Sequence, residues 1–203
     1  MTTILPLKIV QTQDATKRQR KAAGQLATEY LGTDLREAFL TETEVFLALD
    51  GSVVVGIAAA KSLTGSHRQH YLDAISKINE TFPASNRFIE LLQSDTPLAV
   101  DFGVVVAPDY RGRGLSRDLS LTLIDSLRQQ NYYRALLVSA WLDPRGPNRM
   151  VDFGEKHLQS LGVSPEHWKI VNEQGELRSN PCPTCGFSCL CDAQIYGVFL
   201  KRY

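Results

Sequence analysis

The sequence has no excess of charge of either sign, because 22 Lys and Arg residues balance 22 Asp and Glu residues. A balanced chain lacks the basic character of proteins that bind nucleic acids or anionic membrane surfaces. The sequence also lacks an apolar run near the ~20 residues that cross a bilayer. Its N-terminus has no long apolar core of the kind found in signal peptides. We therefore expect a cytoplasmic protein with no nucleic-acid partner and no membrane partner.

Internal repeats and low-complexity segments are also absent, which excludes a repeat array. The chain does have enough length and apolar content for a core, with 203 residues of which 43% are hydrophobic. This length suits one domain, or one domain with an appendage. We predict a single domain over residues 1–203.

Cysteine is absent before residue 182, and all four cysteines follow within one short stretch: Cys182, Cys185, Cys189 and Cys191. Two cysteines separated by two residues form a common zinc half-site, and four thiolates form a structural zinc set. The two pairs are closer together than in most such sites. A disulfide or redox-sensitive pair, an iron–sulfur cluster and unligated thiols are therefore the alternatives. We predict a zinc-binding, cysteine-rich loop over residues 180–192.

Residues 101–127 read as a strand, a glycine-rich turn and a helix. Asp101–Val106 is an almost unbroken valine-rich run, which suits a buried strand. Arg111-Gly-Arg-Gly114 follows, and glycine lets the backbone come close to a ligand. The first N–H groups of a helix favour negative charge. With its two arginines, this turn is predicted to hold an anion such as a pyrophosphate. The helix should bury one stripe: Leu115, Leu119, Leu123 and Leu127.

The spacing of the glycines in this turn shows which of the known phosphate-binding motifs it fits. The dinucleotide fingerprint Gly-x-Gly-x-x-Gly fails because Arg117 stands at the third glycine position, and the P-loop is absent. The turn resembles instead the GNAT superfamily of acyl-CoA-dependent N-acyltransferases, whose signature is Gln/Arg-x-x-Gly-x-Gly/Ala after a valine-rich strand. Ser116 departs from the last position of that signature. The matching positions are Val106, Pro108, Tyr110, Arg111, Gly112 and Gly114.

The resemblance implies a binding mode for acetyl-CoA. The backbone of the cofactor strand would pair with the pantetheine arm, and the amides of the turn would hold the pyrophosphate. The family also has an asparagine near the start of a later helix, where Asn148 is the available residue. The implied cofactor-binding residues are Val104, Val105, Val106, Arg111, Gly112, Arg113, Gly114, Leu115, Ser116 and Asn148.

The resemblance also implies direct transfer of an acetyl group to a primary amine, which needs a proton acceptor and a proton donor. The family's donor tyrosine would fall at Leu158, so its neighbour His157 is the candidate. Asp101 is the only carboxylate in the cofactor strand and is the candidate base, because an acidic residue in an apolar strand is costly unless functional. The alternative for Asp101 is a solvated position at the strand start. Further donor candidates are Tyr132, Tyr133 and Tyr196.

Hydrophobic periodicity and turn residues predict the remaining elements. Asp50-Gly51 suits the type I′ turn of a hairpin. Residues 66–95 read as a helical insertion that either walls a substrate site or serves packing or a dimer surface. The result is an α/β, GNAT-like fold with a single twisted mixed sheet flanked by helices, and a helical insertion before the cofactor strand. Strands are expected over 4–10, 45–49, 53–60, 101–106, 135–141, 168–171 and 194–200, and helices over 12–31, 34–40, 86–93, 115–127 and 148–161.

Three functions fit these features. The first is an acetyl-CoA-dependent N-acetyltransferase with an unidentified amine acceptor, which the resemblance allows to be a homodimer. The second is a non-catalytic acyl-CoA-binding sensor or regulatory module with a metal- or redox-responsive cysteine loop, since the donor tyrosine is missing. The third is an interaction protein that has lost cofactor binding. Turnover of acetyl-CoA against a panel of amines separates the first from the other two.

Overall fold

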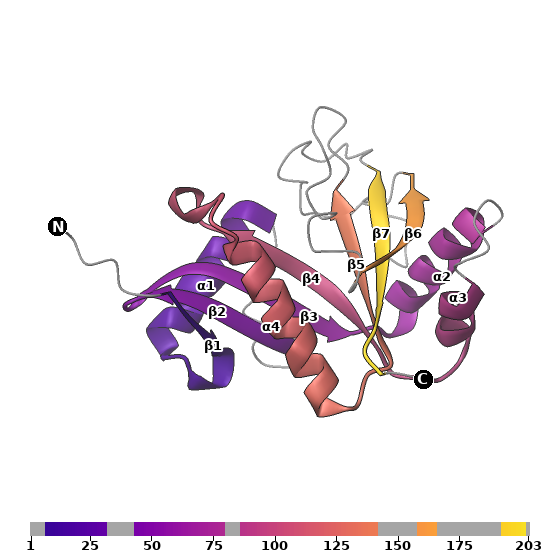
Figure 1. The fold of residues 1–203 in the computed structure, drawn as a ribbon, viewed down its shortest axis with the longest axis horizontal. Coiled ribbons are helices and arrows are strands. Elements are labelled where there is room, and N and C mark those ends of the chain that lie inside the picture. Colours follow the sequence, from indigo (N-terminus) through magenta and orange to yellow (C-terminus); the bar gives the residue numbers. More distant parts are fainter. Residues whose placement is uncertain (1–6, 32–42, 80–85, 142–157, 166–191, 202–203) are drawn as a thin grey trace. The chain divides into compact units, whose positions relative to one another are not determined.

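The computed structural model describes residues 7–31, 43–79, 86–141, 158–165 and 192–201 (Figure 1). The described strands form one seven-stranded sheet in the order β1-β2-β3-β4-β5-β7-β6. The β4–β5 pair is parallel, and the β1–β2, β2–β3, β5–β7 and β6–β7 pairs are antiparallel, so the sheet is mixed as predicted. The elements are β1 (Lys8–Gln11), η1 (Thr12–Asp14), α1 (Lys17–Leu31), β2 (Thr43–Asp50), β3 (Val53–Ser62), α2 (Gly65–Asn79), α3 (Asn86–Gln93), β4 (Leu98–Val106), η4 (Pro108–Tyr110), α4 (Leu115–Gln130), β5 (Ala135–Trp141), β6 (Gln159–Ser164) and β7 (Ala193–Phe199).

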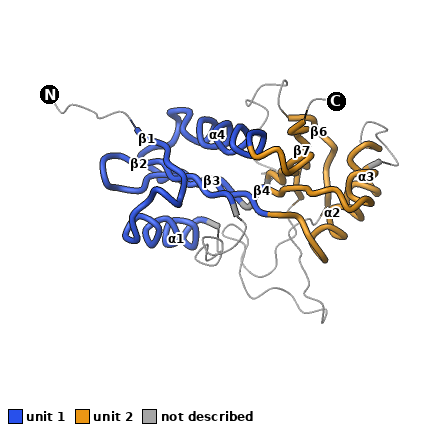
Figure 2. The backbone as a smooth tube through the Cα atoms, turned by 90° about the horizontal axis from the view of Figure 1, so that it is seen from below, with its two compact units in different colours: residues 1–61, 101–129 blue, residues 62–100, 130–203 orange. Residues whose placement is uncertain are grey.

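The chain divides into two compact units (Figure 2). Unit 1 comprises residues 1–61 and 101–129, and unit 2 comprises residues 62–100 and 130–203. The division passes through β4, whose first residues pair with β5 from Leu98 to Val100 and belong to unit 2. The strand from Asp101 onward belongs to unit 1, together with the turn that follows it.

In unit 1, α1 and α4 cover opposite faces of the strands (Figure 2). Ile57 of β3 lies in a core cluster with Ala23 and Ala27 of α1. The preceding residue, Gly56, faces Leu119 of α4, because successive strand residues point to opposite faces. The predicted leucine stripe of α4 is buried, together with Ile124. The predicted hairpin is also present, and Gly51 occupies its turn with a φ of +58°.

Helix α1 begins later than the sequence pattern indicated. The prediction placed its start at residue 12, whereas residues 12–14 form a short 3-10 turn and α1 begins at Lys17. Thr16 and Gln19 form a capping box: the Thr16 hydroxyl accepts from the Gln19 N–H at 3.2 Å, and the Gln19 amide oxygen accepts from the Thr16 N–H at 2.8 Å. These reciprocal bonds satisfy helix-terminal donors and fix the start of α1.

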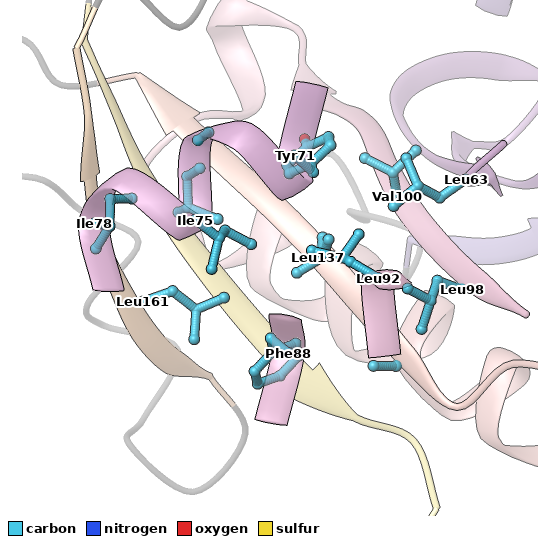
Figure 3. Packing of buried hydrophobic residues seen from close by; sticks show 13 residues of the cluster. Leu63, Tyr71, Ile75, Ile78, Phe88, Leu92, Leu98, Val100, Leu137 and Leu161 are labelled. Atoms are coloured by element: carbon cyan, nitrogen blue, oxygen red, sulfur yellow. The ribbon is translucent and has the colours of Figure 1, made fainter. Parts of the chain in front are cut away.

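Unit 2 contains the predicted helical insertion, as α2 and α3 (Figure 3). Their apolar side chains, among them Ile75 of α2 and Phe88 of α3, pack on strand residues that include Leu137 and Ile195. Arg68 of α2 donates to the carbonyl oxygens of Leu91, Leu92, Ser94 and Thr96 at the C-terminal end of α3. The two helices are therefore joined by a guanidinium cap as well as by the core.

The helix predicted over residues 148–161 is wrong for its described part. Gln159–Ser164 forms β6, which pairs antiparallel with β7 and contains an irregularity between Ser160 and Gly162. Gly162, the residue directly after the predicted helix, has a φ of +119° within this strand. A short apolar segment does not distinguish a strand from a helix by periodicity, and here pairing with β7 decides. Residues 148–157 lie outside the described part, as do the strand predicted over 168–171 and the helix predicted over 34–40.

The start of β4 was also misplaced, by three residues. The prediction began the cofactor strand at Asp101, but β4 begins at Leu98, and both Leu98 and Val100 are buried. Asp101 is therefore an interior strand residue. The alternative placed Asp101 at the strand start, which is wrong, although its side chain is still partly exposed.

Gly197 of β7 gives the fold a position where a methyl group should be destabilising. A Cβ added there would overlap the ring of Phe88, which is 1% exposed. We expect Gly197→Ala to lower the free energy of unfolding by about 1–3 kcal/mol, because overpacking forces side chains out of their rotamers. Denaturant unfolding measures the change. In a Phe88→Leu background the same substitution should cost less, and an equal cost in both backgrounds would contradict this packing.

Candidate active site

The turn after β4 has the conformation that its glycines predict. Gly112 and Gly114 have φ angles of +75° and +81°, a region that residues with a Cβ rarely adopt. A Cβ added at either glycine would meet no atom within 4 Å, so the glycines face open space. Glycine is required here because the backbone is left-handed and because a side chain would obstruct access to the turn. Close packing does not require it.

Helix α4 begins directly after this turn. Its first residue, Leu115, is buried, whereas Ser116 is exposed. The N–H of Asp118 donates to the carbonyl oxygen of Gly114 at 3.1 Å, which is the first bond of the helical pattern. The N–H groups of Leu115, Ser116 and Arg117 precede it and have no acceptor within the helix. Together with the helix dipole, they form a site suited to a phosphate group.

The two arginines of the turn are held by the chain itself. Arg111 donates through Nε to the carbonyl oxygen of Val106 at 2.9 Å, and its guanidinium carbon lies 5.1 Å from the ring centre of Tyr30 in α1. Arg113 donates to the carbonyl oxygen of Asp109 at 2.9 Å and lies over the ring of Tyr110. From the sequence, these arginines were predicted only to contribute positive charge for binding an anion. The structure shows that they also fix the path of the turn.

Tyr110 connects the turn to the β2–β3 hairpin. Its hydroxyl donates to Asp50 Oδ2 at 2.6 Å, and the hydrogen bond raises the pKa of the Tyr110 phenol. Nearby, the N–H of Ala107 donates to the carbonyl oxygen of Val55 in β3 at 2.9 Å. Sequence reasoning did not predict the hydrogen bond between Tyr110 and Asp50, because Asp50-Gly51 indicates only a hairpin turn. The pairing spans 60 positions, and no local pattern indicates it.

The cofactor strand has an irregular point next to its carboxylate. Gly103 has a φ of +143°, and its N–H donates to Asp101 Oδ1 at 2.9 Å. The Asp101 side chain is only partly exposed, and its loss of hydration raises the pKa of the carboxyl group to about 6, which the Gly103 bond partly offsets. A carboxylate with that pKa accepts a proton more readily than an ordinary aspartate and is still mostly ionised at neutral pH.

Residues 101–106 of β4 and the turn lie in unit 1, whereas other predicted site residues lie outside the described part. Val104, Val105 and Val106 precede the turn within unit 1. His157, Asn148 and all four cysteines of the 180–192 loop lie outside the described residues and stay predictions. The helix that was used to place His157 is absent over residues 159–161. Within the described ranges, no group of three or more His, Cys, Asp or Glu residues could hold a metal ion.

The tyrosines considered as proton donors lie in unit 2. Tyr132 is 59% exposed. The hydroxyl groups of Tyr133 and Ser62 are 2.8 Å apart, and Tyr196 is a buried residue of β7 whose pKa is raised by burial. None of these contacts assigns the donor.

Comparison with protein families identifies the chain. The model of the acetyltransferase (GNAT) family matches residues 12–145, which include β4, the glycine turn and α4. The chain belongs to the GNAT acetyltransferase family. Searching curated proteins with the sequence returned no match. The fold, by contrast, is similar to many solved structures.

Three solved structures illustrate the likeness. An N-acetyltransferase from Staphylococcus aureus Mu50 has 14% identity and a TM-score of 0.58, with 97% of this chain and 99% of that chain covered. Arabidopsis thaliana NAA60 in complex with acetyl-CoA has 11% identity and a TM-score of 0.58, with 96% and 98% covered. The ribosomal-protein-S18-alanine N-acetyltransferase from Escherichia coli has 12% identity and a TM-score of 0.56, with 98% and 96% covered.

Family membership confirms the predicted fold class and reaction. This GNAT acetyltransferase uses acetyl-CoA as its acetyl donor and transfers the acetyl group to an amine. Helices of the described part were also searched for membrane spans, and none has the length and apolarity needed to cross a bilayer.

Proposed function

We propose that residues 111–116 hold the pyrophosphate of acetyl-CoA and that Asp101 receives the proton of a primary amine acceptor. The observation that carries this proposal is the open glycine turn at the start of α4. Its glycines are left-handed and have no side chains, and nothing lies within 4 Å of a Cβ added at Gly112 or Gly114. The first N–H groups of α4 follow directly and favour an anion. The backbone from Val104 to Val106 is proposed to pair with the pantetheine arm, as the family resemblance implies.

The role of Asp101 follows from the form of the amine that can react. An alkyl amine is mostly protonated at neutral pH, and only the neutral amine can attack the thioester carbonyl. Asp101 would accept the surplus proton directly or through one water. Its bond from Gly103 N–H fixes the carboxylate on the irregular part of β4. The carboxylate and the turn are positioned by the same unit.

Turnover tests the proposal directly. The purified enzyme is incubated with acetyl-CoA and a panel of amines, which includes small polyamines, amino acids and peptides with free N-termini, and thiol release is measured. We expect release of coenzyme A that depends on one class of primary amine. Acetyl-CoA binding without turnover on any amine would favour the sensor alternative. Absence of acetyl-CoA binding would overturn the proposed site.

Two narrower expectations from the sequence stay predictions. The cysteine-rich loop 180–192 is expected to bind zinc through Cys182, Cys185, Cys189 and Cys191, and elemental analysis of the purified protein checks this. The second prediction is a cytoplasmic location. Neither is needed for the transfer reaction proposed above.

A further inference from the structure

The Asp50–Tyr110 hydrogen bond joins the β2–β3 hairpin to the segment directly before the glycine turn. Asp50 is the last residue of β2 and belongs to the turn of the β2–β3 hairpin. Tyr110 is the last residue of η4, directly before the glycine turn. The 2.6 Å distance between Tyr110 Oη and Asp50 Oδ2 is typical of a bond between a hydroxyl and a carboxylate, which is among the stronger hydrogen bonds in proteins. Both side chains are partly buried, which limits competition from water.

Tyr110 in turn supports the residues that follow it. The guanidinium of Arg113 lies 5.4 Å from the centre of the Tyr110 ring and donates to the carbonyl oxygen of Asp109. Arg111 is held separately, by the carbonyl oxygen of Val106 and the ring of Tyr30. Gly112 and Gly114 have no side chains of their own and face open space. The path of the turn is therefore set by its neighbours: Arg111 contacts Tyr30 of α1, and Tyr110 is hydrogen-bonded to the β2–β3 hairpin.

We infer that Asp50 is a positioning residue for acetyl-CoA, acting through Tyr110 on the turn at residues 111–116. This inference rests on the proposed function of that turn. Backbone N–H groups bind a phosphate well only when they are already oriented, since ordering a loop on binding lowers the affinity. The Asp50 carboxylate supplies this order from outside the turn and is not expected to touch the substrates. Its effect should fall on acetyl-CoA binding and leave the chemical step unchanged.

The test compares Asp50→Ala, Tyr110→Phe and the double variant. Each single substitution removes the bond, and we expect the KM and the Kd for acetyl-CoA to rise about tenfold, the loss typical of one hydrogen bond to a charged group. The kcat should stay within about twofold because the bond does not reach the reacting atoms. The double variant should be no worse than the single variants, since both remove the same interaction.

Two controls separate positioning from a general loss of structure. Asp50→Asn keeps an acceptor oxygen and an Asn-Gly turn that also suits the hairpin, so it should bind acetyl-CoA more tightly than Asp50→Ala does. Thr122→Val removes the hydroxyl of a partly exposed residue that bonds to the carbonyl oxygen of Asp118 on α4, and it should leave KM unchanged. A merely structural Asp50 would lower the melting temperature and the active fraction, and therefore the apparent kcat, with KM constant.

The outcomes distinguish this inference from the proposed function. If Gly114→Trp abolishes acetyl-CoA binding while Asp50→Ala and Tyr110→Phe bind it as the wild type does, the turn is the cofactor site and the positioning role of Asp50 is wrong. If Gly114→Trp binds acetyl-CoA normally, the proposed site itself is wrong. Additive losses in the double variant would show that the two residues act separately, which also overturns the inference.

Discussion

Gly114→Trp should lower the affinity for acetyl-CoA by at least about 100-fold, which corresponds to roughly 2.7 kcal/mol. Gly114 precedes the first residue of α4, and a side chain there would extend into the open space in front of the helical N–H groups. The φ of +81° adds strain for any residue with a Cβ. The indole would therefore both distort the turn and cover the proposed phosphate site. Isothermal titration calorimetry with acetyl-CoA measures the change.

Gly65 offers a matched control for this substitution. It is the first residue of α2, has a φ of +51°, and a Cβ added there would also meet nothing within 4 Å. Gly65→Trp adds the same bulk under similar backbone strain, but in the other compact unit. We expect it to lower stability to a similar extent and to bind acetyl-CoA as the wild type does. Equal losses of affinity in both variants would mean that the effect at Gly114 reports folding and not the site.

Asp101→Asn should lower kcat by about 100-fold or more, because removing a general base typically costs two to four orders of magnitude. The substitution keeps the size of the side chain and an oxygen that can accept from the N–H of Gly103. The dependence of kcat/KM on pH gives a sharper readout. The wild type should lose activity as the pH falls through about 6, where the raised pKa of Asp101 lies. The variant should lack this acid limb, and Asp125→Asn, at an exposed position of α4, should keep it.

The same pKa has a consequence for stability with a defined sign. The carboxyl group of Asp101 titrates near 3.8 in the unfolded chain and near 6 in the folded protein, so between these values the folded state binds more protons. The free energy of unfolding therefore falls as the pH rises from about 4 to about 6 and levels off above it. Asp101→Asn should remove this part of the dependence and be the more stable protein above pH 6. Unfolding of both proteins at several pH values tests the sign.

Local sequence signals predicted the parts of this fold whose determinants are close in the chain. The Asp50-Gly51 turn, the leucine stripe of α4 and the glycine-rich turn before α4 each depend on a few neighbouring residues. A helical insertion over residues 66–95 was also predicted, and Ile75 and Ile78 of its helix α2 are buried. The motif around the turn also indicated the family, and the family resemblance in turn predicted the reaction.

Features set by distant partners were not predictable in this way. The apolar content of residues 159–164 fits a helix or a strand, and only pairing with β7 made it β6. The interior position of Asp101 in β4 and its bond from the N–H of Gly103 were not predicted either, because the strand begins three residues earlier than its valine-rich run indicated. Arg111 contacts the ring of Tyr30, and Asp50 accepts a hydrogen bond from the hydroxyl of Tyr110, so both positions depend on residues of other segments. These contacts are tertiary, and the sequence has no local pattern for them.

The guanidinium cap on α3 determines how the helical insertion would open. An isolated helix of eight residues is not stable in water, so α3 depends on its buried side chains and on Arg68, which donates to carbonyl groups in its last turn. Detaching α2 would remove both supports at once. The two helices are therefore expected to exchange their amide hydrogens as one cooperative unit, with similar opening free energies along both, and not to fray separately.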